Sequence, residues 1–126
     1  MLIREVSNIN NKQIGTEFEQ EVVEKLSKAG YWAHFISPDN RGAQPFDVIA
    51  VKNGIAVVGD CKTCKAKTFS ISRLEDNQIM AFQKWESCGN KPPFIFVKHS
   101  EKIYVIPWRK VFEKGRVKIN DFPCWE

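Results

Sequence analysis

The first pattern of apolar and polar positions along the chain has the period of a helix. In residues 14–29 the apolar side chains recur every three to four positions, as Phe18, Val22 and Leu26 do. This spacing predicts an amphipathic helix with one face toward a core. The apolar and aromatic run 31–36 that follows predicts a first strand.

A second pattern predicts a hairpin. Two runs rich in β-branched residues, 46–52 and 55–62, flank the dipeptide Asn53-Gly54. Asn-Gly between such runs is the strongest short-range signal of a two-residue hairpin turn. We therefore expect two antiparallel strands that turn on these residues.

The remainder of the chain alternates between helical and strand patterns. It predicts a helix capped by Ser72, two strands, a short helix that starts at Pro107, and an edge strand, in residues 72–87, 94–97, 102–106, 107–114 and 117–119. With the first helix and the hairpin, this order predicts a single α/β domain over residues 1–126.

Composition narrows the class of protein. The chain is 43% hydrophobic and 27% charged, as in compact domains, and carries no apolar run of membrane-spanning length. Residues 1–11 lack the apolar segment of a secretory signal, so we expect a cytoplasmic protein without a membrane partner.

The net charge of +4 is small but unevenly distributed. Residues 62–73 carry four bases and no acid, and residues 98–118 carry seven bases against two acids. Segregated positive charge suits a nucleic-acid backbone, although a solvated surface without a partner is an equal alternative.

Cys61 and Cys64 form a C-x-x-C pair, but no second Cys or His pair completes a zinc signature. Reduced thiols are expected instead, with Cys61 packed in its strand as a small apolar side chain.

The hairpin register places Asp47 opposite Asp60. Facing carboxylates about 5 Å apart repel by roughly 3 kcal/mol at an effective dielectric of about 20. Either one carboxyl holds a proton or a cation lies between them, and oxygen ligands favour Mg²⁺ or Mn²⁺. Strand alternation adds Lys62 to the face of Asp60, where a plain salt bridge with Asp47 is the alternative.

Two further polar residues interrupt apolar stripes. Glu19 lies on the core-facing side of the first helix, where a carboxylate needs a partner. It either shares a cation with Asp47 and Asp60 or forms a cap or a buried salt bridge. Gln78 lies in the apolar stripe of the second helix. It either orients a water or a phosphate, or it is a core amide that bonds to the backbone.

Four motifs in this order resemble the PD-(D/E)XK nuclease superfamily: Gly15-x-x-x-Glu19, Asp47-Val48-Ile49-Ala50, Asp60-Cys61-Lys62 and Gln78. The resemblance covers about residues 12–107 and is strongest to Holliday-junction resolvases of the Hjc and RecU type, although most of these have Glu at the position of Asp60. It implies a restriction-endonuclease-like core, with a central mixed β-sheet flanked by helices.

The same resemblance implies a metal-dependent endodeoxyribonuclease of DNA recombination and repair that acts as a homodimer on four-way junctions. It implies Mg²⁺, with Mn²⁺ as a substitute, held by Glu19, Asp47, Asp60 and the main-chain carbonyl of Cys61. Lys62 and Gln78 complete the expected catalytic set. The expected DNA contacts are Ser37, Arg41, Lys65, Lys67 and Arg73.

Two alternatives stay open from the sequence. One is a restriction- or repair-type nuclease of the same superfamily, and the other is a non-catalytic nucleic-acid-binding domain. A small stand-alone nuclease also suits a phage or another mobile element.

Overall fold

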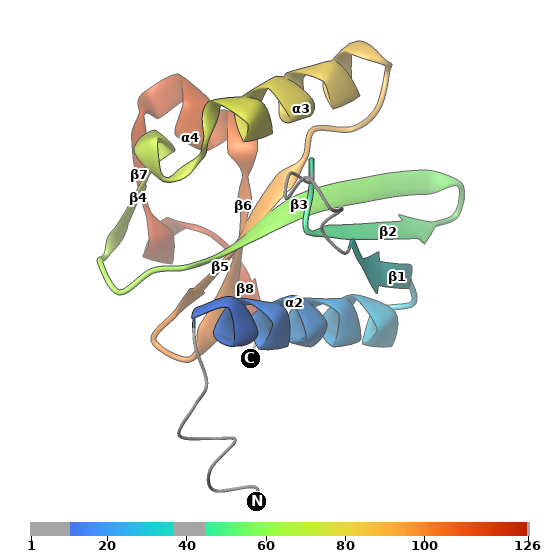
Figure 1. Ribbon diagram of the computed structural model, residues 1–126, viewed down its shortest axis with the longest axis horizontal. Helices are drawn as coiled ribbons and strands as arrows, with labels where there is room; N and C mark the ends of the chain where they lie inside the picture. Colours follow the sequence, from blue (N-terminus) through green and yellow to red (C-terminus); the bar gives the residue numbers. More distant parts are fainter. Residues whose placement is uncertain (1–10, 37–44, 126) are drawn as a thin grey trace, which may run out of the picture.

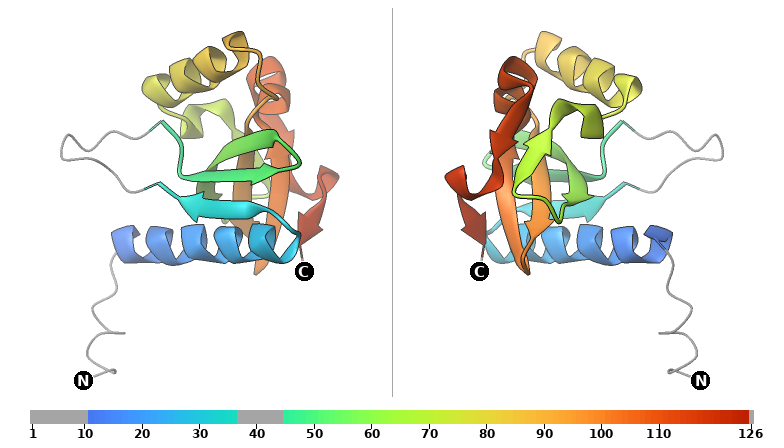
Figure 2. Two further views of the ribbon diagram at one scale, coloured as in Figure 1. Left: turned by 90° about the vertical axis from the view of Figure 1, so that its right-hand side faces the viewer. Right: turned by 90° about the vertical axis from the view of Figure 1, so that its left-hand side faces the viewer.

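A six-stranded sheet lies between two layers of helices in the computed structural model, which describes residues 11–36 and 45–125 (Figure 1). Helix α2 (Asn11–Lys28) covers one face of the sheet, and α3 (Asp76–Ser87) and α4 (Trp108–Lys114) pack against the other. The two side views in Figure 2 show α2 and α3 on opposite sides of the strands. The predicted α/β architecture is therefore confirmed.

The strand order in this sheet is β1-β2-β3-β5-β6-β8. Only β3 and β5 run parallel, and every other neighbouring pair is antiparallel, so the sheet is mixed as predicted. Its strands are β1 (Trp32–Phe35), β2 (Val48–Lys52), β3 (Ile55–Thr63), β5 (Phe94–His99), β6 (Lys102–Pro107) and β8 (Cys124–Trp125).

The predicted hairpin between β2 and β3 is confirmed in its register. Lys52 pairs with Ile55 next to the turn, and Asn53 and Gly54 have φ angles of 53° and 77°. Positive φ at both turn residues is the requirement of a type I′ turn, which Asn-Gly meets at low cost. The ladder continues to the pair of Val48 with Gly59.

A second, two-stranded sheet joins β4 (Thr68–Ser70) to β7 (Arg116–Lys118) in antiparallel pairing. Short 3₁₀ helices follow both strands, η1 (Ile71–Arg73) after β4 and η2 (Ile119–Asp121) after β7. The edge strand predicted in residues 117–119 corresponds to β7, and its pairing with β4 joins segments that are distant in the chain.

The predicted start of the second helix at Ser72 is wrong. Ser72 belongs to η1, and its N–H donates to Oγ of Ser70 at 3.2 Å. Helix α3 begins only at Asp76, because the side-chain Oε1 of Gln78 accepts the N–H of Glu75 at 3.0 Å and fixes the helix start there. Gln78 is thus the third residue of the helix.

Each face of the sheet carries its own hydrophobic core cluster. On the α3 face the ring of Phe82 stacks on Phe46 at 5.7 Å and meets Trp108 edge-on at 5.2 Å between centroids. On the α2 face Phe18 and Val22 pack against the strands, as the helical stripe predicts. Among the described helices, none combines the length and apolar character that a membrane span needs.

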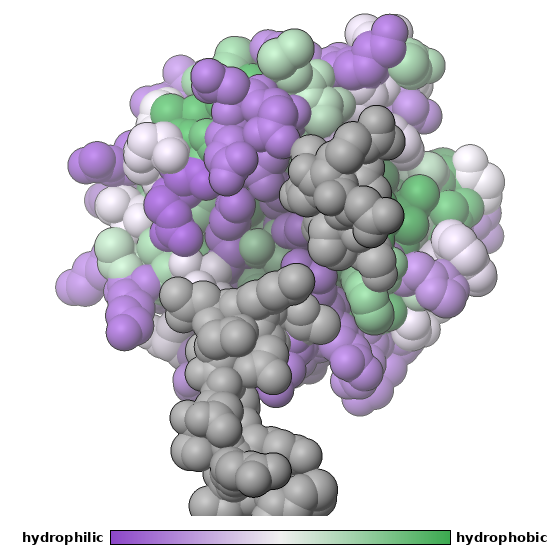
Figure 3. Space-filling model, viewed as in Figure 1, coloured by the Kyte–Doolittle hydropathy of each residue, from purple (hydrophilic) through white to green (hydrophobic). Residues whose placement is uncertain are grey.

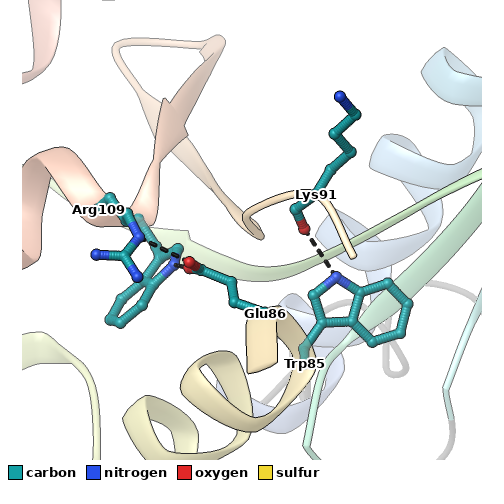
Figure 4. A network of polar contacts seen from close by, with 5 residues as sticks. Trp85, Glu86, Lys91 and Arg109 are labelled. Carbon is teal, nitrogen blue, oxygen red and sulfur yellow. Dashed lines mark hydrogen bonds and ion pairs between the residues drawn. The ribbon is translucent and has the colours of Figure 1, made fainter. Parts of the chain in front are cut away.

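A polar bridge fixes α3 against α4 (Figure 4). Nε1–H of the fully buried Trp108 donates to Oε2 of Glu86, while Oε1 of Glu86 accepts Nε–H of Arg109 at 2.7 Å. Nε1–H of Trp85 donates to the carbonyl of Lys91 at 2.8 Å and closes the loop after the helix. These bonds hold α3 in place above the sheet, with its N-terminus toward β3.

Candidate active site

The site forms where β3 extends beyond β2. Strand β2 begins at Val48 opposite Gly59, whereas β3 continues to Thr63. The N–H of Asp47 donates to the Gly59 carbonyl at 3.0 Å, and Oδ2 of Asp47 accepts the N–H of Cys61 at 2.7 Å. The Asp47 carboxylate therefore satisfies a β3 donor that has no partner in β2.

This geometry corrects the predicted cross-strand pair. The ladder between β2 and β3 ends with the pair of Val48 and Gly59. Asp47 lies one residue beyond this end, so it does not pair with Asp60. The two carboxyl groups still interact, since the charge of Asp47 is among the causes that raise the pKa of Asp60. The residues are brought together, but through a break in strand pairing.

Asp60 is the most unusual residue of this region. It is 1% exposed, and neither side-chain oxygen has a hydrogen-bond partner within the described residues. Burial first, and then the negative charge of Asp47, raise its pKa from 3.8 to about 8, while Lys62 acts to lower it. A buried carboxyl without a partner costs stability, so it is retained where a ligand supplies the partner.

Glu19 reaches the same region from the opposite layer. It is half-buried on α2, and burial followed by the charge of Asp47 raises its pKa to about 7. Its charge in turn contributes to the raised pKa of Asp60. Within the described residues Glu19 forms no hydrogen bond or ion pair, so the salt-bridge and capping alternatives find no partner here.

Lys62 and Gln78 meet on the α3 face of the sheet. Nζ of Lys62 lies 3.4 Å from Oε1 of Gln78, the same oxygen that accepts the N–H of Glu75. Gln78 is thus bonded to the backbone, as one alternative predicted, and also holds the lysine beside Asp60. Both side chains are half-buried.

The two cysteines of the C-x-x-C pair face opposite layers. Cys61 packs against the core cluster under α2, and burial raises the pKa of its thiol well above the usual range. Cys64 lies in the cluster under α3, with Sγ 3.5 Å from the carbonyl of Thr68. The prediction that Cys61 packs as a small apolar side chain is confirmed.

The acids form an all-oxygen donor set of the kind that Mg²⁺ and Mn²⁺ prefer. In their present orientation, no three Asp, Glu, His or Cys side chains of the described residues converge closely enough to hold a metal ion. Binding of a divalent cation by Glu19, Asp47 and Asp60 therefore requires at least one of them to turn.

Lys65 and Lys67 are exposed on the loop that leaves β3. Arg73 is exposed in η1, and its Nη2–H donates to the carbonyl of Thr63 at 2.8 Å. Three of the five predicted DNA contacts therefore lie just after the site residues in the sequence. The other two lie outside the described residues: Ser37 and Arg41.

Sequence reasoning missed the role of Glu75. In a helix that started after Ser72, Glu75 would be the third residue, but it is the residue just before α3, and its charge contributes to the raised pKa of Asp60. The spacing of Glu75 and Gln78, three residues apart, is the signal that locates this helix start.

A mixed sheet with helices on both faces, and with carboxylates and a lysine gathered at its central hairpin, defines a restriction-endonuclease-like fold. Two solved structures share it. Hjc of Archaeoglobus fulgidus, a Holliday junction resolvase, aligns with a TM-score of 0.60 and 20% identity over 75% of this chain and 78% of that one. The bacterial homing endonuclease I-Ssp6803I aligns with a TM-score of 0.57 and 17% identity over 86% and 73%.

The sequence defines the family. The model of the family described as archaeal Holliday junction resolvase (hjc) matches residues 10–121, so the chain belongs to this family and the predicted resemblance is confirmed. The crossover junction endodeoxyribonuclease Hjc of Methanocaldococcus jannaschii is 27% identical over 94 residues, 75% of this chain. The match spans 66% of that relative, just under two thirds of its length.

Proposed function

We propose that this protein is a structure-selective endodeoxyribonuclease that cuts branched DNA at Holliday junctions. Membership of the archaeal resolvase family supports the substrate class. The observation that carries the chemistry is Asp60, a buried carboxyl without a hydrogen-bond partner in the described residues, in electrostatic contact with Asp47, Glu19 and Lys62. A site with this composition is suited to phosphodiester hydrolysis.

A divalent cation, Mg²⁺ or Mn²⁺, fits the donor chemistry of the site. Glu19, Asp47, Asp60 and the main-chain carbonyl of Cys61 would hold it, and the unpartnered oxygens of Asp60 are the feature that supports this assignment. When bound, the cation supplies Lewis-acid chemistry, lowering the pKa of a water and neutralising charge on the phosphate.

The cationic side chains of the protein have distinct roles in this proposal. Lys62 places its ammonium next to the acids, where it would bind a phosphate oxygen and stabilise the charge that develops during hydrolysis. Gln78 holds Nζ of Lys62 in that position. Lys65, Lys67 and Arg73 would bind the DNA backbone without reading its sequence.

A homodimer is part of the proposal. A four-way junction presents two symmetry-related strands, and a two-fold pair of subunits would place one site at each strand. Dimerisation is measured by analytical ultracentrifugation, with and without junction DNA.

The test compares three labelled substrates, a four-way junction, a linear duplex and a single strand, each with Mg²⁺ or with chelator. We expect paired, symmetric cuts in the junction alone, and only with Mg²⁺. Asp60→Asn should lower cleavage by about 1,000-fold, an effect of the size seen for groups that stabilise the transition state, while junction binding is retained. Glu24→Gln, which removes an exposed acid of α2, is the matched control.

The other outcomes decide between the alternatives. Equal cutting of all three substrates would favour a repair- or restriction-type nuclease, and junction binding without cleavage would favour a non-catalytic domain. A wild-type rate in Asp60→Asn would remove this residue from the chemistry.

A further inference from the structure

A cleft of about 440 Å³ lies beside α4 and β7, and none of the active-site residues Glu19, Asp47 and Asp60 lines it. Four basic residues line it, together with Val117, Phe122 and a single acid, Asp121. The four bases, called the basic cleft below, are Lys110, Lys114, Arg116 and Lys118.

Local structure places all four bases on one surface. Lys110 and Lys114 are four residues apart and therefore share a face of α4. Arg116 and Lys118 flank the buried Val117 and therefore share the outer face of β7. Gly115, with φ of 79°, reverses the chain between the two elements.

Within the described residues, the four bases are not paired with acids. All four are exposed, and none forms an ion pair or side-chain hydrogen bond with any described residue. Arg109, the residue before this group, is by contrast paired with Glu86 at 2.7 Å. Four cations and a single acid line the cleft, so the cations repel one another, and a polyanion relieves that repulsion.

The small sheet connects the basic cleft to the active site. Pairing of β4 with β7 places Ser70 beside Arg116 and Thr68 beside Lys118. The N–H of Ile119 also donates to the carbonyl of Lys67 at 3.0 Å. The second basic segment of the sequence therefore lies along the first, which begins at Lys62 in the site.

The surface shares this character. Hydrophilic side chains predominate on the side of the molecule formed by β4 and β7 (Figure 3). Lys65 and Lys67 after β3, and Arg116 and Lys118 on β7, are therefore brought together through the small sheet.

We propose that the basic cleft binds the phosphate backbone of a duplex arm that extends from the active site. This inference rests on the proposed function, because it assigns to that site a second DNA contact. Flexible lysines bind phosphates as point charges, so the contact positions the arm independently of its sequence and weakens with salt.

The experiment measures binding in chelator, where DNA is not cut, to four-way junctions with arms of about 10 or about 25 base pairs at several salt concentrations. The variant Lys110→Gln/Lys114→Gln changes one wall of the basic cleft, and Arg116→Gln/Lys118→Gln changes the other. Lys28→Gln/Lys91→Gln, with the same net charge, is the control, since both lysines are exposed and outside the basic cleft.

Each cleft variant should bind the long-armed junction about 5- to 20-fold more weakly, with a salt slope lower by about two at most. The short-armed junction and the control should change less than about twofold. Thermal unfolding checks that all variants fold.

Unchanged affinity of the cleft variants, or an equal loss in the control, would overturn the inference. An equal dependence on the cleft for duplex RNA of the same sequence would overturn the assignment to a DNA arm. If the wild type never cuts with Mg²⁺ but binding still depends on the arm and the cleft, the proposed function fails while this inference stands.

Discussion

The charges around Asp60 are unbalanced in sign. Among the described residues, Asp47, Glu19 and Glu75 act to raise its pKa, and Lys62 is the one charged group that acts to lower it. A phosphate that enters such a site meets more negative charge, so its approach depends on the cations that face it. Lys62 is the cation that acts on Asp60, so the binding of phosphate depends on the contact between Lys62 and Gln78.

That contact makes Gln78 the informative position. Gln78→Leu removes the acceptor of both Lys62 and the Glu75 N–H. We expect about 10-fold slower single-turnover cleavage, less than the about 100-fold cost of removing a transition-state donor, because Lys62 itself remains. We also expect a loss of about 1 kcal/mol in unfolding free energy from the cap. Gln78→Glu keeps an acceptor and the cap but adds an acid that repels phosphate, so it should fold normally and bind the junction more weakly.

Gln83→Leu provides the comparison, because Gln83 is an exposed amide on the same helix. Cleavage by Gln78→Leu at the wild-type rate would show that the Lys62 contact is only structural. Rapid-quench kinetics and thermal unfolding separate the two roles.

At the scale of elements, the site depends on how α2 docks. Nζ of Lys98 on β5 lies 2.6 Å from Oε1 of Glu21 and 5.9 Å from the centroid of the Phe18 ring. Glu19 lies between these two helix residues in sequence. The ion pair thus fixes the segment of α2 that carries the acid.

Lys98→Met should therefore raise the Mg²⁺ concentration for half-maximal cleavage several-fold. The unfolding free energy should fall by less than about 1 kcal/mol, because the pair is partly exposed. The charge-swapped variant Glu21→Lys/Lys98→Glu should restore much of the Mg²⁺ response, and Lys102→Met is the control. If the Mg²⁺ requirement of all variants changed only in proportion to their unfolding free energy, the ion pair would not position Glu19. The measurement is a cleavage titration with Mg²⁺.

Elements set by local chemistry were predictable from the sequence. The Asn53-Gly54 turn set the hairpin register, and the short helix predicted in residues 107–114 is α4, which begins just after Pro107 and ends before Gly115. The start of α3 was not predictable from Ser72, because pairing of β4 with β7 draws Ser72 into η1 instead. Ser72 and Glu75 were both possible helix caps, and tertiary contacts selected Glu75.

The site likewise combines features that the local sequence predicts with features that depend on tertiary contacts. Glu19 and Gln78 stood out because polar residues interrupted apolar stripes, and both lie at the site in the structure. The break in pairing at Asp47 and the pair of Lys98 with Glu21 join distant residues. A sequence does not display such contacts, since no local period encodes them.

For the whole molecule, the cluster of acids links folding to proton binding. Unfolded, Glu19 and Asp60 lose their protons near their ordinary pKa values of 4.5 and 3.8. In the folded state, burial and neighbouring acids raise the pKa of Glu19 to about 7 and that of Asp60 to about 8. Between these limits the folded state binds more protons than the unfolded state, so its stability decreases as the pH rises.

We therefore expect the unfolding free energy, measured by urea titration in chelator, to fall between about pH 5 and about pH 8. Asp60→Asn, which cannot ionise, should flatten this dependence and make the protein more stable than the wild type at pH 8. A cation that binds the ionised acids should stabilise the wild type more at pH 8 than at pH 5, because it replaces the protons. An unchanged pH slope in Asp60→Asn would show that this carboxyl is ionised in the folded protein, and the electrostatic argument for a cation at Asp60 would then fail.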